Sequence, residues 1–355
     1  MAAALTSRER FQRMFEHREA DRIPIIDSPW ADTIERWHSE GMPRDVSFVD
    51  YFDLDHVVHV GGDSGPRWPS ERLEETDEYV VDRTSWGVTL KNLKRTSVPQ
   101  YLDFRINSPE AWQEAKERMQ PARDRVDWDH LRRHYAGWRE GGAWVCGGLW
   151  FGFDAAHAFT DMEQLLEAMI ERPEWVADMF NTCLDASLAI LEMIWDEGYT
   201  FDSVFWCDDM GYRGTQFFSL KAYRALLRPA QQRAIDWAHA RGIEAHLHSC
   251  GNVMAFVPDL VDMGLDALNP LEVKAGMDAL KLKREYGGRL VLHGGINAVL
   301  WDNLPAIEAE MRRVVPELAR GGGFIFSSDH SVPSSVSLEG FRRIVELAKE
   351  LGAYR

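Results

Sequence analysis

The sequence contains no long hydrophobic run: none of its apolar stretches reaches the roughly 18 residues that a membrane-spanning helix needs. The N-terminus becomes charged at Arg8, Glu9 and Arg10, which does not fit a secretory signal. These two absences predict a cytoplasmic protein that does not enter a membrane.

Positive charge is also in short supply. The chain has 40 Lys and Arg against 57 Asp and Glu, which gives a net charge of −17. Such a field repels a phosphate backbone, so we do not expect a nucleic acid partner. A polyanionic small molecule would need a local positive pocket in order to bind.

Two motifs that would indicate other functions are missing. The four cysteines are scattered without a Cys-x-x-Cys pair, which argues against a disulfide framework in a cytosolic chain. No Gly-x-Gly-x-x-Gly follows any of the strands predicted below, so the usual dinucleotide signature is absent.

What the sequence does contain is a repeated alternation of short apolar runs and helical patterns. The eight runs read as strands are 22–27, 56–60, 143–149, 203–207, 243–248, 266–269, 290–294 and 323–327. The helical patterns are 161–171, 173–198, 219–241, 253–263, 277–286, 303–319 and 337–351, and Asp161, Ser219 and Ser337 are their plausible caps. Eight strands of this kind predict a (β/α)8 TIM-type barrel in a single domain, 1–355, and a doubly wound open sheet is the alternative.

The segment 61–142 does not fit this repeat. Its runs 79–84 and 86–91 look like a hairpin, and Pro109–Met119 looks like a helix. We interpret the segment as an insertion after the second strand that covers the barrel mouth, meaning the end of the barrel where the strands reach their carboxyl ends.

Polar and ionisable residues gather at the predicted strand ends. In a barrel of this kind the catalytic groups come from those ends and from the loops that follow. So many polar groups at one rim predict a functional site, because purely structural strand ends would not need them. The residues concerned are Asp27, Asp208, Asp209, Tyr212, His248, Cys250, Asn269, Glu272, His293, Asn297, Asp329 and His330.

His248 and Cys250 are the most informative pair at this rim. They are two residues apart at the end of a strand, so their side chains can point to one face. Imidazole and thiolate are ligands that zinc prefers, although two ligands do not make a site. Each also has a structural alternative: Cys250 as a buried cysteine under the glycine turn, and His248 as a rim histidine.

The other rim residues have simpler readings too. Asp208 and Asp209 could cap a turn, and His293 could be structural. His330 could act as a general acid or base without a metal. His246, which shares the face of His248 but lies deeper, is interpreted as a polar residue of the core.

Four strings in the second half of the chain resemble the uroporphyrinogen decarboxylase superfamily. They are His-Ser-Cys-Gly-Asn at 248–252, Asp-Ala-Leu-Asn-Pro-Leu at 266–271, Leu-His-Gly-Gly-Ile at 292–296 and Gly-Gly-Gly-Phe-Ile-Phe at 321–326. The resemblance covers residues 5 to 352 in outline and is strongest from 203 to 335. It implies a (β/α)8 barrel, and the superfamily includes the zinc-dependent methyltransferases that serve corrinoid proteins.

The decarboxylase branch of that superfamily matches poorly. It carries an arginine-rich loop after the first strand, whereas this chain has Asp-Ser-Pro-Trp-Ala-Asp at 27–32 and no arginine before Arg36. It also carries a catalytic aspartate after the second strand, where Asp63 stands here at a displaced position. An acidic loop would oppose a polycarboxylate, so we do not expect uroporphyrinogen itself to be the substrate.

The methyltransferase branch matches better, because it has His-x-Cys and a third ligand after the last strand. The resemblance implies a zinc site made by His248, Cys250 and His330, with His330 where the branch usually has cysteine. Three ligands leave one position open for a substrate heteroatom, and Glu272 could fill it when substrate is absent. The remaining roles that we assign are catalysis for His330, Glu272 and Asp208, and substrate binding for Asp209, Tyr212, Asn297 and His293.

The sequence therefore predicts a metal-dependent methyltransferase that acts on a small substrate or on a methyl group carried by a corrinoid protein. One alternative is a metal-free decarboxylase of a small carboxylic acid, with His330 as proton donor. Another is a non-catalytic barrel that binds a tetrapyrrole or a corrinoid. Metal analysis of the purified protein separates the first hypothesis from the other two.

Overall fold

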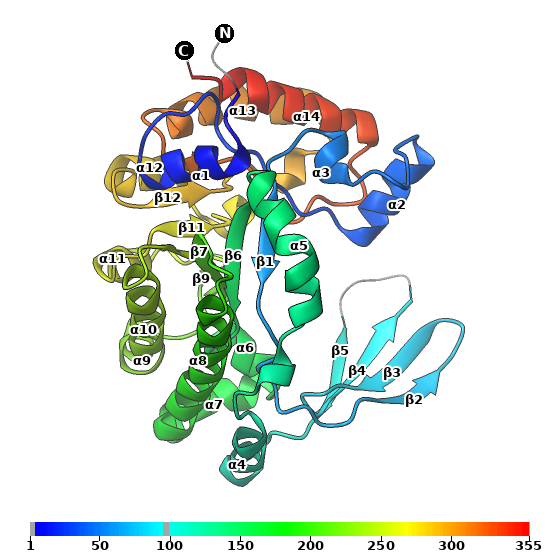
Figure 1. Ribbon diagram of the computed structural model, residues 1–355, viewed down its shortest axis with the longest axis vertical. Helices are drawn as coiled ribbons and strands as arrows, with labels where there is room; N and C mark the ends of the chain where they lie inside the picture. The colour runs from blue at the N-terminus through cyan, green and yellow to red at the C-terminus, as the bar shows by residue number, and fades with distance from the viewer. Residues whose placement is uncertain (1–3, 95–98, 355) are drawn as a thin grey trace.

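A computed structural model describes residues 4–94 and 99–354 of the chain. Its centre is a seven-stranded parallel sheet that curls into a TIM-like barrel, in the order β1-β6-β7-β10-β11-β12-β13 (Figure 1). The predicted α/β class is confirmed, and each of these strands falls within a predicted strand. They are β1 (Val57–Val60), β6 (Trp144–Leu149), β7 (Ser203–Cys207), β10 (Glu244–His248), β11 (Ala267–Asn269), β12 (Val291–His293) and β13 (Phe324–Ile325).

The segment predicted as the first strand, 22–27, is not a regular strand. Ile25 forms an isolated parallel bridge with Phe326. On the other side, the Asp55 N–H donates to the Ile25 carbonyl over 2.9 Å, while the Ile25 N–H donates to the Asp55 carboxylate rather than to a strand carbonyl. Pro24 has no N–H to donate, which also shortens the ladder. The prediction of eight regular strands is therefore corrected to seven strands and one extended segment between β13 and the start of β1.

Helices surround the sheet, and the three predicted caps are confirmed. The side chains of Asp161, Ser219 and Ser337 each accept a backbone N–H from the first turn of the following helix. The helices are α1 (Ser7–Phe15), α2 (Ala31–Ser39), α3 (Phe48–Tyr51), α4 (Pro109–Arg118), α5 (Trp128–Glu140), α6 (Gly152–His157), α7 (Met162–Glu171), α8 (Pro173–Asp196), α9 (Leu220–Ala222), α10 (Arg228–His239), α11 (Val257–Asp262), α12 (Ala279–Tyr286), α13 (Leu304–Ala319) and α14 (Leu338–Leu351).

One predicted helix, 219–241, is interrupted. A π-helical turn, Tyr223–Leu227, separates α9 from α10. Pro229 lies in the first turn of α10 and has no N–H to donate to the preceding turn. The missing hydrogen bond accounts for the wider turn just before it.

Helix α1 closes the end of the barrel opposite the mouth. Phe11 and Phe15 stack on Trp144, with ring centroids 5.4 and 5.3 Å apart. These aromatic rings pack with Ala267 and Ile325 in a small core cluster inside the barrel. Because this end is filled, access to the interior depends on the mouth and on the gaps between elements.

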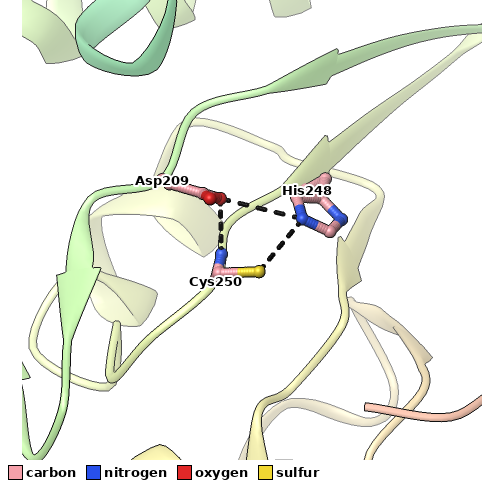
Figure 2. Close-up of side chains that lie close together, drawn as sticks. All are labelled: Asp209, His248 and Cys250. Carbon is pink, nitrogen blue, oxygen red and sulfur yellow. Dashed lines mark hydrogen bonds and ion pairs between the residues drawn. The ribbon is translucent and has the colours of Figure 1, made fainter. Parts of the chain in front are cut away.

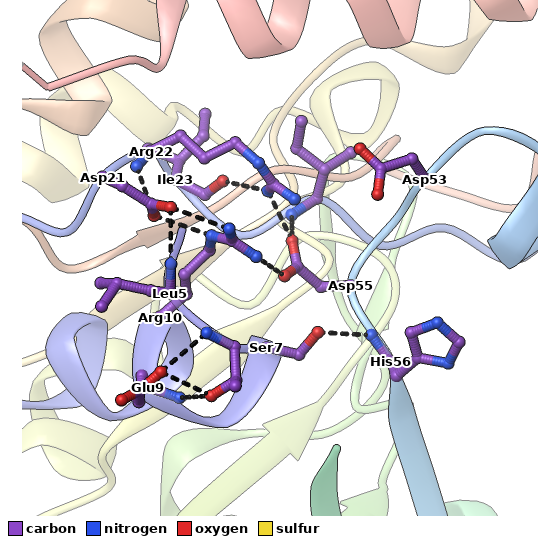
Figure 3. Close-up of polar contacts among 12 residues, drawn as sticks. Leu5, Ser7, Glu9, Arg10, Asp21, Arg22, Ile23, Asp53, Asp55 and His56 are labelled. Carbon is purple, nitrogen blue, oxygen red and sulfur yellow. Dashed lines mark hydrogen bonds and ion pairs between the residues drawn. The ribbon is translucent and has the colours of Figure 1, made fainter. Parts of the chain in front are cut away.

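An ion cluster fastens α1 to the barrel (Figure 3). The carboxylate of Asp55 is fully buried, and it pairs with Arg10 over 2.9 Å and with Arg22 over 2.6 Å. Arg10 also pairs with Asp21 over 2.8 Å. The cluster joins α1, the extended segment 22–27 and the start of β1.

The insertion after β1 is larger than the predicted hairpin. It forms a four-stranded antiparallel sheet that projects to one side of the barrel (Figure 1). The predicted hairpin corresponds to its middle strands and the predicted helix to α4, but two outer strands were missed because their side chains are mostly exposed and do not alternate. The strands are β2 (Glu71–Glu75), β3 (Tyr79–Arg83), β4 (Val88–Leu93) and β5 (Gln100–Phe104).

The insertion contacts the barrel through Trp86. The Trp86 ring lies 4.2 Å from that of Trp150 and 4.8 Å from that of Phe159, and both partners follow the carboxyl end of β6. The range 61–142 also contains α5, an unpredicted helix that leads into β6. Coverage of the mouth by the insertion stays a prediction.

No helix in the described ranges is both long and apolar enough to span a lipid bilayer.

Candidate metal centre

The turn after β10 brings three potential ligands together. His248 ends β10, and Gly251 then adopts φ +78°, a left-handed conformation that favours glycine. Gly251 lies against Gly211 so closely that an added Cβ would sit 2.2 Å from the Gly211 carbonyl carbon. This close approach sets Cys250 beside Asp209, which comes just after β7.

Asp209, His248 and Cys250 point toward one another (Figure 2). The His248 Nε2 atom is 3.3 Å from the Cys250 Sγ atom and 3.7 Å from an oxygen of Asp209. One ligand atom from each residue lies within 4.8 Å of the other two. All three residues are half-buried, so the cluster can be reached from outside.

Asn269 fixes the orientation of the His248 ring. The Asn269 amide nitrogen donates to the His293 carbonyl, which turns its oxygen toward Nδ1 of His248. An amide oxygen only accepts, so Nδ1 carries a proton, and in this tautomer of the ring Nε2 is the nitrogen with the lone pair. That lone pair faces the Cys250 sulfur, as a metal ligand of this kind requires.

The electrostatics of the cluster suit a cation. Burial raises the pKa of the Cys250 thiol, and the carboxylates of Asp209 and Glu272 raise it further. Burial also raises the pKa of Asp209, with Asp154 adding to the effect. A divalent ion among these ligands would reverse both effects, because it stabilises thiolate and carboxylate.

His330 is not part of this cluster, which contains Asp209 in addition to His248 and Cys250, so the predicted role of His330 as the third ligand stays a prediction. Its ring stacks on Trp30, with centroids 6.2 Å apart. Asp329 fixes the loop just before it, because its carboxylate accepts the N–H groups of Val273 and Ala298, both over 2.7 Å. These contacts with segments distant in sequence hold the loop that carries His330. His330 still lines the same cavity as His248 and Cys250.

Asp208, predicted as a catalytic residue, instead holds the start of α6. It is fully buried and lines neither of the hollows described below. One carboxylate oxygen accepts the N–H groups of Phe153 and Asp154, and the other accepts the side-chain amide of Gln231. Burial raises the pKa of Asp208 to about 8. Asp208 thus caps α6, which precedes it in the chain, rather than the turn that follows it, and its catalytic role stays a prediction.

Glu272 and Tyr212 lie on the far side of Cys250. A Glu272 oxygen accepts the N–H of Gly251 over 2.6 Å, and its other oxygen is 3.3 Å from the Lys274 ammonium. Glu272 therefore supports the turn that carries Cys250. Tyr212 is exposed and lines the same surface hollow as Glu272 and Cys250.

Asn297 and His293 have mainly structural contacts. The Asn297 side chain accepts the N–H of Val299 and so caps a short 3₁₀ turn. His293 is buried with its Nδ1 atom 3.2 Å from Nε2 of His246, and burial lowers the pKa of His293 to about 3. The role of either residue in substrate binding stays a prediction.

Two hollows meet at Cys250. A cavity of about 560 Å³ runs inside the barrel from Phe11 and Trp144 to His248 and Cys250. A second, more open hollow of about 720 Å³ is lined by Cys250, Asp209, Tyr212 and Glu272, among others. The candidate metal centre therefore stands where an interior cavity meets the outer surface.

Two residues of the cavity wall received no role from the sequence. Asp27 accepts hydrogen bonds from the N–H and hydroxyl of Ser328 and from the N–H of Ser28, and burial raises its pKa to about 6. His59 points into the cavity from β1. The signals available in the sequence were Asp27, a polar residue that ends the first apolar run, and His59, one of two histidines in the second.

A TIM-like barrel with a histidine, a cysteine and a carboxylate at its mouth defines a class of barrel enzymes able to hold a metal. Residues 143–351 match the Uroporphyrinogen decarboxylase (URO-D) family, and the chain belongs to that family. The family is named for a decarboxylase, and its members are enzymes.

Two similar proteins are informative. The chain is 26% identical over 199 residues to a uroporphyrinogen decarboxylase of Protochlamydia amoebophila (strain UWE25), a match that covers 54% of this chain and 50% of that protein. The chain thus spans about half the length of this curated relative. Its fold is similar to that of a methyltransferase from Methanosarcina mazei, with a TM-score of 0.66, 16% identity, and coverage of 98% of this chain and 99% of the other. At that identity the likeness shows the fold alone.

Proposed function

We propose that the chain is a metal-dependent enzyme that transfers a methyl group to or from a small substrate, with zinc bound by Asp209, His248 and Cys250. The observation that carries the proposal is the convergence of these three ligand atoms within 4.8 Å at the barrel mouth. The predicted branch resemblance and the likeness in fold to a methyltransferase support it.

The donor set suits zinc. Imidazole nitrogen, thiolate sulfur and carboxylate oxygen are its common protein ligands, and three of them leave a position open for substrate. When bound, the metal would act as a Lewis acid that turns a coordinated thiol or hydroxyl group into a nucleophile near neutral pH.

The residues around the centre would then position the ligands. Asn269 orients His248, and Glu272 holds the turn of Cys250 through the Gly251 N–H. We retain His330 as a proton-transfer residue, because it lines the same cavity. Burial and the nearby Lys274 lower the pKa of His330, which favours the neutral ring that can accept a proton.

The other participant in this methyl transfer is a corrinoid carried by a partner protein, which donates the methyl group when the substrate receives it and accepts it when the substrate gives it up. A metal-free decarboxylase is the second candidate, and the family to which the chain belongs favours it. Against it, no lysine or arginine among the described residues lines the interior cavity, where a carboxylate substrate would need a cation.

Metal analysis of the purified chain tests the proposal. We expect one zinc ion per chain, and loss of zinc in His248→Ala, Cys250→Ala and Asp209→Asn. Cys183→Ala is the control, because Cys183 is buried in α8 and lines neither hollow. In cobalt-substituted protein, a sulfur-to-cobalt absorption band should disappear in Cys250→Ala alone among the cysteine variants.

Two outcomes would contradict the proposal. Zinc content equal in all variants would show that the three residues do not bind it, and no metal after reconstitution would remove the metal-dependent mechanism. His330→Ala decides the ligand set, since it should keep its zinc if Asp209 is the third ligand.

A further inference from the structure

The interior cavity has no positive side chain on its wall. Of the described residues that line it, none is lysine or arginine. Phe11 and Trp144 form one end, and Phe205, Val57 and Val49 form part of the sides. Aromatic and aliphatic side chains therefore form much of the wall, and polar residues lie both near the mouth and deeper, where His246 and Asp55 stand.

Besides His248, four histidines line the cavity: His59, His246, His293 and His330. Burial lowers the pKa of His293 to about 3, so its ring carries no charge at pH 7. These imidazoles offer hydrogen bonds to a polar group of a ligand.

The carboxylates on the wall are already satisfied. Asp55 is paired with Arg10 and Arg22, which hold it from behind the cavity wall. Asp27 accepts hydrogen bonds from Ser28 and Ser328. An anion entering this space would lose its hydration, find no positively charged side chain on the wall and lie near the Asp27 carboxylate.

We propose that the interior cavity binds an uncharged, flat and largely apolar small molecule, whose polar end lies at His248 and Cys250. The cavity of about 560 Å³ has a size typical of small-molecule sites. Aromatic and aliphatic walls favour a flat apolar body, and the ligands at the mouth favour one heteroatom at its end. The inference deepens the proposed function and rests on it for the identity of the cavity as the substrate site.

Three probes of nearly equal shape test the charge requirement: benzamide, benzoate and benzamidine, which are neutral, anionic and cationic. Their binding to the full-length chain is measured by calorimetry after metal removal, since benzoate could otherwise bind the metal directly. We expect benzamide to bind at millimolar concentration and benzoate to bind at least about tenfold more weakly. Benzoate or benzamidine binding as tightly as benzamide, or no binding of benzamide, would overturn the inference.

Two cavity variants locate the binding. Val49→Lys places an ammonium at a half-buried position of the wall and should make benzoate bind more tightly than benzamide. Val57→Phe fills part of the cavity and should weaken benzamide at least about tenfold. Val299→Lys is the matched control, since Val299 is exposed on the second hollow and should change neither affinity. If Val299→Lys alone reversed the preference, the ligand would lie outside the interior cavity and the inference would fail.

These measurements separate the inference from the proposed function. The zinc content of the wild type and of the three ligand variants tests the proposed function. The preference for benzamide over benzoate in metal-free protein tests the inference about the cavity. A chain without zinc that still prefers benzamide would contradict only the proposed function. A zinc-binding chain that prefers benzoate would contradict only the inference.

Discussion

The imidazole of His248 and the amide of Asn269 form a pair at the neighbouring ends of β10 and β11, with Nδ1 lying 2.5 Å from Oδ1. The two residues are register partners in the parallel sheet, so the sheet itself sets their separation. The pair decides which nitrogen of His248 is free, and it therefore links the packing of the barrel to the chemistry of its mouth.

Asn269→Ala should weaken zinc binding about 10- to 100-fold, because the ring loses the partner that fixes its tautomer and orientation. Competition with a chromophoric chelator measures the affinity. Asn303→Ala is the control: Asn303 caps α13, and its loss should cost stability without changing the affinity for zinc. Equal zinc affinity in Asn269→Ala and the wild type would mean that Asn269 has no orienting role.

Gly251→Ala should disturb both the fold and the metal site. The new Cβ would meet the Gly211 backbone at 2.2 Å, in addition to the strain of φ +78°, and we expect a loss of about 1–3 kcal/mol in the free energy of unfolding. Gly214 has the same φ and no atom within 4 Å of an added Cβ. Gly214→Ala should therefore cost only about 1 kcal/mol and keep the zinc affinity. Equal effects of the two variants in urea denaturation would show that the close approach is unimportant.

The sequence predicted the barrel well because its strands are short apolar runs and its helices have strong caps. Ser203–Cys207 and Glu244–His248 fall within the predicted runs, since both strands lie between the outer helices and the barrel interior and need no alternating pattern. The segment 22–27 was predicted as a regular strand but is only extended. The composition of the segment does not reveal that the Asp55 carboxylate takes the place of a strand partner. The outer strands of the insertion were missed because exposed strands lack the burial that produces a pattern.

The candidate site was only half predictable. His248 and Cys250 are close along the chain, so the geometry of one strand end is enough to pair them. Asp209 joins them because Gly251 and Gly211 come into contact, and a contact between backbones of distant segments leaves only two glycines as its signal. For the same reason the sequence could not distinguish Asp208, which caps a helix, from the adjacent Asp209, which lies in the candidate metal centre.

Asp208→Asn should flatten the pH dependence of stability. The pKa of Asp208 rises from 3.8 to about 8 on folding, so the native state binds this proton more tightly than the unfolded state does. The contribution of Asp208 is therefore complete below pH about 4 and is lost as the pH rises toward 8. Urea denaturation at pH 5 and pH 8 should show a larger decrease for the wild type than for the variant. The same decrease in both proteins would mean that Asp208 does not titrate over this range.

Arg10→Ala should destabilise the chain by about 3–5 kcal/mol, because it removes one of the two arginines that pair with the fully buried Asp55 (Figure 3). Arg22 remains, but Asp21 also loses a partner, and α1 loses its attachment to the start of β1. Arg18→Ala is the control, since Arg18 is 60% exposed in its pair with Glu16, and it should cost at most about 1 kcal/mol. Chemical denaturation at pH 7 gives both values.

Because α1 also forms the end wall of the interior cavity through Phe11, Arg10→Ala should weaken benzamide binding as well. A stable Arg10→Ala variant with unchanged benzamide affinity would show that packing of Phe11 and Phe15 on Trp144 holds this end of the barrel without the ion cluster.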